Sequence, residues 1–310
     1  MSVKTTNYTA QGFLLAIAAT VLWSGNFIIS RKVSTAIGPI SLAFFRWATA
    51  AIVLLPFAYK ETKANLPIIK ANWKILFFIT LTGIALFNTF VYVAGHHTTA
   101  INMALIGTTS SPIFATILAV IFLKERLGPF RIIGMLLCIL GILLLLSKGR
   151  WDILRQFHFS KGDLWVLAGA FAFAIYNIIV RQKPAAIGAL SFLLIIFALG
   201  TLMLLPFFVL EQLWSTQNIQ WSIALLASIA YLGIGTSVIA FWCWNLAISK
   251  LGAGRTVLFG NLIPIFSTIE AVLLLGESMT LIHLYSGIMV IIGLIIANLT
   301  LKKQSASNGH

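Results

Sequence analysis

The chain has 310 residues, of which 60% are hydrophobic and only 9% are charged, and its mean hydropathy is +1.00. Soluble domains carry about 25% charged residues, so this chain cannot cover itself with polar surface and its solvent must be mostly lipid. The net charge of +14 comes from residues spread over loops. Positive-inside topology explains that excess without a nucleic-acid partner.

Ten apolar windows have roughly the length needed to cross a hydrocarbon layer of about 30 Å, and we expect a transmembrane helix in each. They are residues 11–31, 38–58, 74–95, 98–123, 130–147, 162–181, 188–210, 222–248, 252–275 and 281–300. The connections between them are short, and even the two longest hold no globular domain. The sequence therefore predicts an all-α integral membrane protein.

The second half of the chain repeats the first. P-I-F-A-T-I-L-A-V-I-F-L-K-E from Pro112 and P-I-F-S-T-I-E-A-V-L-L-L-G-E from Pro264 share nine of fourteen positions at an offset of 152, and A-I-G and L-L-P-F recur at an offset of 150. Because each copy holds an odd number of spans, the copies must be inverted relative to each other. The predicted units are two inverted five-helix repeats at 1–147 and 162–301, a linker loop at 148–161 and a short tail at 302–310.

The distribution of basic residues predicts the orientation. Fourteen of the 21 lysine and arginine residues fall on one side of the predicted spans, six fall on the other, and Arg46 lies inside a span. This bias places both termini in the cytoplasm. Short loops and short tails favour a multi-pass protein of the bacterial plasma (inner) membrane.

Several motifs resemble the drug/metabolite transporter superfamily, in its EamA-type ten-helix branch. They are W-S-G-N-F at 23–27, F-R-W at 45–47, and the ends of the paired Pro…Glu segments, L-K-E-R-L at 123–127 and L-G-E-S-M at 275–279. The resemblance covers essentially the whole chain, and it implies a transporter, since similar members export amino acids and other small metabolites and some carry drugs. One departure is Glu270, which stands where the first repeat has Leu118.

Repeat symmetry predicts a substrate site near the middle of the membrane, between the two copies. Asn88, Tyr92 and His96 form a polar stripe at i, i+4 and i+8 on an apolar helix. Aromatic faces and freed carbonyls suit an ammonium group, and amides suit a carboxylate; the alternative is ordinary helix packing with polar groups bonded across helices. The predicted substrate-binding residues are Trp23, Asn26, Asn88, Tyr92, Thr109, Tyr176, Trp244, Asn245 and Asn261.

Two ionisable residues lie within spans, where charges are costly and usually functional. Arg46 and Glu270 fall at matching depth, roughly 10–12 Å below one membrane surface. We expect them to pair, or Glu270 alone to exchange a proton, although Arg46 can also snorkel outward and Glu270 lies on the opposite helix face from Asn261. The predicted gating or coupling residues are Arg46, His96, Pro112, Pro264 and Glu270.

No pattern in the chain predicts catalysis. It has no H-E-x-x-H, no G-x-S-x-G and no paired-carboxylate motif, so we expect no enzyme, no metal and no cofactor. A channel would need rings of charge or a carbonyl filter. The prediction is a secondary transporter that works by alternating access, most simply an exporter of apolar or aromatic amino acids; an exporter or antiporter of sugar-like or cationic metabolites or drugs is the alternative. Its expected partners are a small-molecule substrate and the lipid bilayer, with the chain as a monomer or homodimer.

Overall fold

The computed structural model describes residues 2–124, 128–150, 160–215, 218–251 and 256–299. Within these ranges the chain is helical and contains no strand. In the same ranges, seven helices are long and apolar enough to cross a membrane, and three shorter apolar helices accompany them. The predicted all-α membrane fold is confirmed.

The helices form two sets that match the two halves of the sequence. The first set is α1 (Ser2–Lys32), α2 (Pro39–Ala64), α4 (Trp73–Thr80) continued by the π-helical η1 (Leu81–Leu86) and α5 (Phe87–Gly95), α6 (Ala100–Leu123) and α7 (Pro129–Leu146). The second set is α9 (Lys161–Ile179) with η2 (Val180–Gln182), α10 (Ala189–Trp214), α11 (Ile223–Ala230) continued by the π-helical η3 (Tyr231–Ile239) and α12 (Ala240–Leu251), η4 (Val257–Leu262) with α14 (Ile263–Leu275), and α15 (Leu281–Leu299).

The helix ends differ from prediction where charged residues follow an apolar run. Helix α2 continues to Ala64 although its apolar window ends at residue 58, and a short helix α3 (Leu66–Ala71) occupies part of the connection that follows. Lys and Glu are good helix formers, so the helix continues through them even though their charges lie outside the hydrocarbon layer. The predicted tail and most of the predicted linker loop lie outside the described residues.

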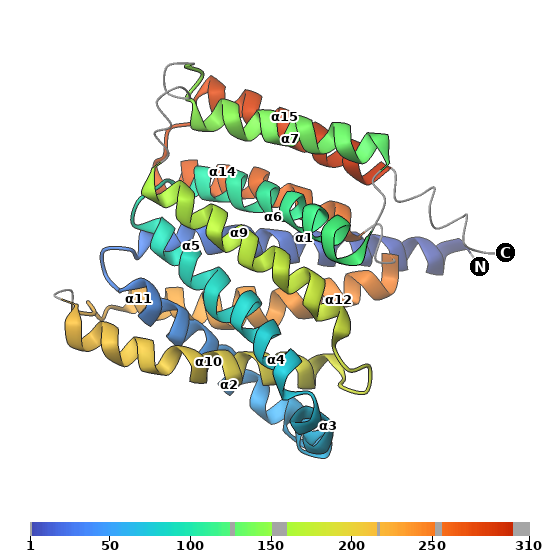
Figure 1. Ribbon diagram of the computed structural model, residues 1–310, viewed down its shortest axis with the longest axis vertical. Coiled ribbons are helices and arrows are strands. Elements are labelled where there is room, and N and C mark those ends of the chain that lie inside the picture. The colour runs from blue at the N-terminus through green and yellow to red at the C-terminus, as the bar shows by residue number, and fades with distance from the viewer. Residues whose placement is uncertain (1, 125–127, 151–159, 216–217, 252–255, 300–310) are drawn as a thin grey trace.

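Successive spans run in alternating directions (Figure 1). Helix α1 begins and α15 ends on one side of the bundle, here called the terminal side, whereas α9 begins on the opposite, far side. The two sets of five helices therefore start on opposite sides, as an inverted repeat requires.

Helices α7 and α15 lie side by side at one edge of the bundle (Figure 1). Gly134 and Gly293 bring their backbones together so closely that a Cβ at either position would meet backbone atoms of the partner helix. The Cys138 thiol donates to the Val290 carbonyl at 3.5 Å. Small residues at such contacts are the usual means of packing helices in lipid.

Helices α2 and α10 pack against each other, and near the end of each helix an acidic residue meets the start of the other. On the far side the Glu211 carboxylate of α10 accepts hydrogen bonds from the backbone N–H groups of Ile40 (3.1 Å) and Ser41 (2.7 Å) and from the Ser41 hydroxyl (2.6 Å). A carboxylate at this place satisfies free N–H groups and interacts favourably with the helix dipole.

The same arrangement recurs on the terminal side. The Glu61 carboxylate of α2 lies against Gly188, the residue that precedes α10, and the Thr62 hydroxyl donates to Ser191 Oγ at 3.0 Å. Glu61 and Glu211 are 150 residues apart, the offset of the repeat. We call these two contacts the α2–α10 clamp.

Two further acids also serve helix starts on the far side. The Glu277 carboxylate accepts from the backbone N–H groups of Ala100 (2.8 Å) and Ile101 (3.2 Å) at the start of α6. Asp163 and Ser160 form a capping box at the start of α9. These carboxylates stabilise the starts of helices. They are therefore not placed to pair with a charged side chain inside the bundle.

Replacing Glu211 with Ala should lower the apparent Tm in detergent by about 2–6 °C, because it removes charge-assisted hydrogen bonds to two backbone groups. Gln212→Ala is the matched control, since Gln212 makes one bond to the Ser41 hydroxyl. Equal Tm values for the two variants would contradict the capping role. Thermal unfolding of the purified protein measures the difference.

Candidate functional site

The site is built around Arg46, a charged residue inside a membrane span. It lies seven residues after Pro39, about 10 Å along the axis of α2, and its side chain is only 4% exposed. Nη1 lies 2.6 Å from Asn26 Oδ1, 2.7 Å from Asn88 Oδ1 and 2.7 Å from the Tyr92 hydroxyl. Nε donates to Ser237 Oγ at 3.0 Å. We call these five residues the Arg46 cluster.

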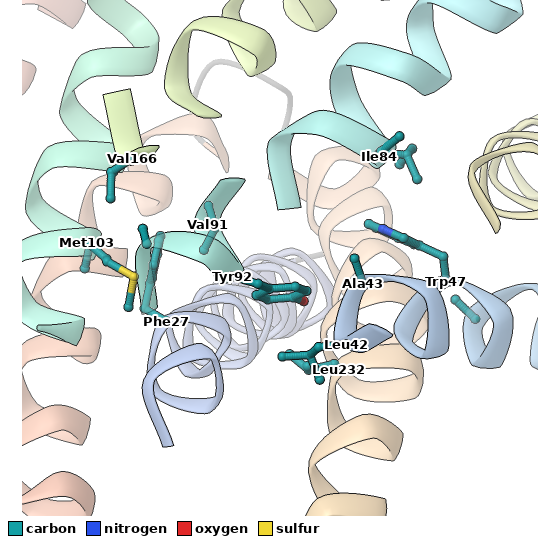
Figure 2. Close-up of a cluster of buried hydrophobic side chains, with 14 of the residues drawn as sticks. Phe27, Leu42, Ala43, Trp47, Ile84, Val91, Tyr92, Met103, Val166 and Leu232 are labelled. Carbon is teal, nitrogen blue, oxygen red and sulfur yellow. The ribbon is translucent and has the colours of Figure 1, made fainter. Parts of the chain in front are cut away.

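The five members of the cluster come from four helical segments, α1, α2, α5 and η3. Asn88 and Tyr92 lie one turn apart on α5 and so share a face, while Asn26 comes from α1 and Ser237 from η3. Tyr92 also donates to Asn26 Oδ1 at 3.1 Å. In Figure 2 the Tyr92 ring lies between Phe27 on one side and Ala43 on the other. The cluster thus ties helices of the first repeat to the second repeat through Ser237.

A chain of aromatic rings runs beside the cluster. Trp23 packs against Trp244 with ring centroids 5.0 Å apart and against Phe241 at 5.4 Å. Phe241 contacts Phe197 at 6.4 Å, and Phe197 contacts Trp47 at 4.8 Å. The Arg46 Cζ atom lies 4.5 Å from the centroid of the Trp47 ring. A polar centre and an apolar, aromatic surface are therefore neighbours.

The π-helical segment η3 shapes this surface. A π-turn is wider than an α-turn and leaves carbonyls poorly matched within the helix. Trp23 Nε1 donates to the Thr236 carbonyl at 3.0 Å, and the hydroxyls of Thr236 and Ser237 both donate to the Leu232 carbonyl. The other π-helical segment, η1, occupies the equivalent span of the first repeat, and there the Tyr176 ring fills the space that a Cβ on Gly83 would need.

Glu270 does not pair with Arg46, which corrects that part of the sequence expectation. Its Oε1 accepts from the Ser24 hydroxyl at 2.6 Å, and its Oε2 is buried with no hydrogen-bond partner among the described residues. Ser24 and Asn26 are two residues apart on α1, so they point about 200° apart around the helix axis. The two charges match in depth but lie on opposite faces of α1.

Polar groups also meet at the far-side end of the cluster. His96 follows α5, half-buried, and Arg31 Nη1 donates to the carbonyl of the preceding Gly95 at 3.0 Å. Burial lowers the pKa of His96 below its ordinary value; the neighbouring His97 and Arg31 act in the same direction, and the Glu211 carboxylate opposes them. His96 is therefore held toward its neutral form.

The remaining predicted residues lie apart from the Arg46 cluster. Tyr176 of α9 stacks on Phe173 at 5.3 Å, and Thr109 of α6 is fully buried with its hydroxyl unpartnered among the described residues. Asn245 of α12 is exposed. The placement of the Asn261 side chain, on η4, lies outside the described part of the structure.

The two prolines occupy different positions. Pro112 lies inside α6 and is exposed, whereas Pro264 is buried at the start of α14. The two prolines therefore affect different parts of the helix in the two repeats. Among the described residues, no group of three or more His, Cys, Asp or Glu side chains is placed to hold a metal ion.

Sequence reasoning did not single out Ser24 or Tyr231. Ser24 holds Glu270, and Ser267 donates to the Ser24 carbonyl at 3.2 Å. The Tyr231 hydroxyl donates to the Leu22 carbonyl at 3.0 Å and fills the space beside Gly25. The only available signal was the small, polar W-S-G-N-F segment, where serine and glycine interrupt an apolar helix.

The fold and this buried polar site define a multi-pass membrane protein built from two similar halves. The model of the EamA-like transporter family matches residues 10–147 and again residues 160–299. The chain belongs to this family, which is one of transporters and not of enzymes.

Relatives match along nearly the full chain. An uncharacterized transporter of Archaeoglobus fulgidus is 26% identical over 283 residues, covering 90% of this chain and 94% of its own length. The uncharacterized transporter YyaM of Bacillus subtilis is 24% identical over 289 residues, covering 92% and 93%. An S-adenosylmethionine uptake transporter of Rickettsia conorii is 28% identical over 272 residues, covering 86% and 83%.

A crystal structure of another protein is also similar. It has a TM-score of 0.62 and 17% identity, and the match covers 95% of this chain and 99% of that chain. At this identity the likeness shows the fold alone.

His96→Gln should make the apparent Tm less sensitive to acid. Because the folded state lowers the pKa of His96, the unfolded chain binds more protons below about pH 6.5, and stability falls as the pH falls through this range. His97→Gln removes only the second cause and should reduce the slope less. A Tm profile from pH 7 to pH 5 that is identical for His96→Gln and the unmodified protein would contradict this assignment.

Proposed function

We propose that this protein is a secondary transporter that moves small metabolites carrying an amino-acid group, with an apolar or aromatic remainder, by alternating access. The observation that carries the proposal is the contact between Trp23 of the first repeat and Trp244 of the second, beside the Arg46 cluster. Transporters built from inverted repeats bind their substrates at such a repeat interface near mid-membrane.

The chemistry of this interface supports a zwitterion with an apolar part. Trp23 and Trp244 offer ring faces for apolar or cationic groups, and Asn26, Asn88 and Tyr92 add buried polar atoms within the same group of helices. Thr109, Tyr176, Asn245 and Asn261 remain proposed contributors in other conformations. The relative named as an S-adenosylmethionine transporter favours the same class, because S-adenosylmethionine contains an α-amino-acid group.

Export is the proposed direction, in a bacterial plasma membrane with both termini in the cytoplasm. The excess of basic residues predicted for the terminal side supports this orientation. The relative named for uptake supports the opposite direction. Transport of labelled amino acids in proteoliposomes of defined orientation tests both, and uptake alone would overturn export.

We further propose that Glu270 exchanges a proton during the cycle, with His96, Pro112 and Pro264 contributing to gating. Glu270 is suited to this role because Oε1 has a hydroxyl partner while Oε2 has none among the described residues. Buried carboxylates in membrane spans often serve as proton carriers.

Trp244→Ala should raise the apparent KM for an aromatic amino acid about 10-fold, because it removes an aromatic contact at the repeat interface. Trp242→Ala is the matched control on the same helix, since Trp242 is 60% exposed and lies outside the aromatic chain. Proteoliposome transport measures both variants. Normal transport by Trp244→Ala would remove the aromatic site from the proposal.

Glu270→Gln should flatten the pH dependence of transport, since an amide cannot take up the coupling proton. Ser24→Ala keeps the carboxylate and should retain a pH dependence, shifted in position by the loss of the 2.6 Å hydrogen bond. Initial rates from pH 5.5 to pH 8.5 provide the comparison. An unchanged profile in Glu270→Gln would refute proton coupling through this residue.

A further inference from the structure

We propose that the Nη2 edge of Arg46 is an anion-binding site that takes the carboxylate of the transported compound. The identity of the ligand rests on the proposed transport function. The anion site itself rests on the geometry of the guanidinium and can be tested without transport.

The first argument is a count of donors. An arginine side chain carries five N–H groups: one on Nε, two on Nη1 and two on Nη2. In this protein Nε donates to Ser237, and Nη1 is surrounded by the oxygens of Asn26, Asn88 and Tyr92. Nη2 has no acceptor among the described residues. The guanidinium is therefore held through Nε and Nη1, and the two N–H groups of Nη2 are left to donate.

The second argument is charge. The four side chains that share hydrogen bonds with Arg46 in the described ranges are all neutral. A charge buried to this extent is costly unless an opposite charge compensates it. The five acidic residues in the described ranges are all placed elsewhere: Glu61 and Glu211 in the α2–α10 clamp, Asp163 and Glu277 at helix starts, and Glu270 at Ser24. A bound anion would supply the missing negative charge.

The third argument is the match in chemistry. A carboxylate oxygen accepts a short, charge-assisted hydrogen bond from a guanidinium N–H, which is the kind of donor that Nη2 still offers. The aromatic chain that starts at Trp47 begins directly beside the guanidinium, so an apolar group attached to the carboxylate would meet ring surfaces. Asn26, Asn88 and Tyr92 are positioning residues here, because they fix the guanidinium and leave Nη2 to the ligand.

Formate is the smallest carboxylate probe, and formamide is a neutral molecule with the same number of heavy atoms. Formate at about 100 mM and constant ionic strength should raise the apparent Tm of the unmodified protein by about 2–5 °C, given a Kd of ~1 mM for so small a ligand, whereas formamide should not raise it. Equal effects of formate and formamide, or no effect of formate, would overturn the proposal. An equal effect of chloride would reassign the site to an inorganic anion.

Arg46→Gln should abolish the formate effect. Lys63→Gln should retain it, because Lys63 is an exposed cation on the same helix and its loss changes the net charge equally. Where Arg46→Gln does not fold, Arg46→Lys keeps the charge but has a single nitrogen, which the oxygens around Nη1 would occupy. It should therefore bind formate about 10-fold more weakly. Retention of the full formate effect in either Arg46 variant would refute the assignment.

A transport assay distinguishes failure of the anion site from failure of the proposed transport function. L-phenylalanine and L-phenylalaninamide share their ring and ammonium group, and only the first carries a carboxylate. Transport of the acid but not the amide supports both proposals, whereas equal transport of the two removes the carboxylate site and leaves the transporter intact. If neither is transported while formate still protects through Arg46, the anion site stands and the amino-acid substrate fails.

Discussion

The structure depends on holding one positive charge inside a membrane span. An isolated charge in hydrocarbon is expensive, and here the expense is reduced by oxygens gathered from several helices around Arg46. Moving α1, α5 or η3 away from α2 would strip the guanidinium of a partner. The positions of these segments are therefore coupled through the Arg46 side chain. The aromatic contacts beside Arg46 depend on that coupling as well.

The sequence predicted the membrane class and the approximate spans because hydropathy depends on composition alone. It also predicted that Asn88 and Tyr92 share a face, since that follows from helical spacing. Trp23 and Trp244, which the sequence analysis assigned to one site between the two copies, are in ring contact. These successes rest on periodicity within one helix or on symmetry between two.

The failures come from rotation between helices, which no one-dimensional pattern records. Arg46 and Glu270 have matching depth, yet α1 stands between them and gives each its own partner. Trp242 and Trp244 are two residues apart on α12, and the first faces outward while the second packs on Trp23. The width of the π-turns in η3 also changes which side chains point inward, and the apolar sequence of that segment gives no sign of it.

The α2–α10 clamp fastens these two helices to each other near both membrane surfaces at once. Two helices joined at only one end could separate at the other end. Because α2 and α10 are joined at both ends, they resist separation and would tilt together. In the alternating-access cycle proposed above, α2 and α10 would then move as one unit. Arg46 belongs to α2, so its guanidinium would keep its position relative to α10 during such a movement.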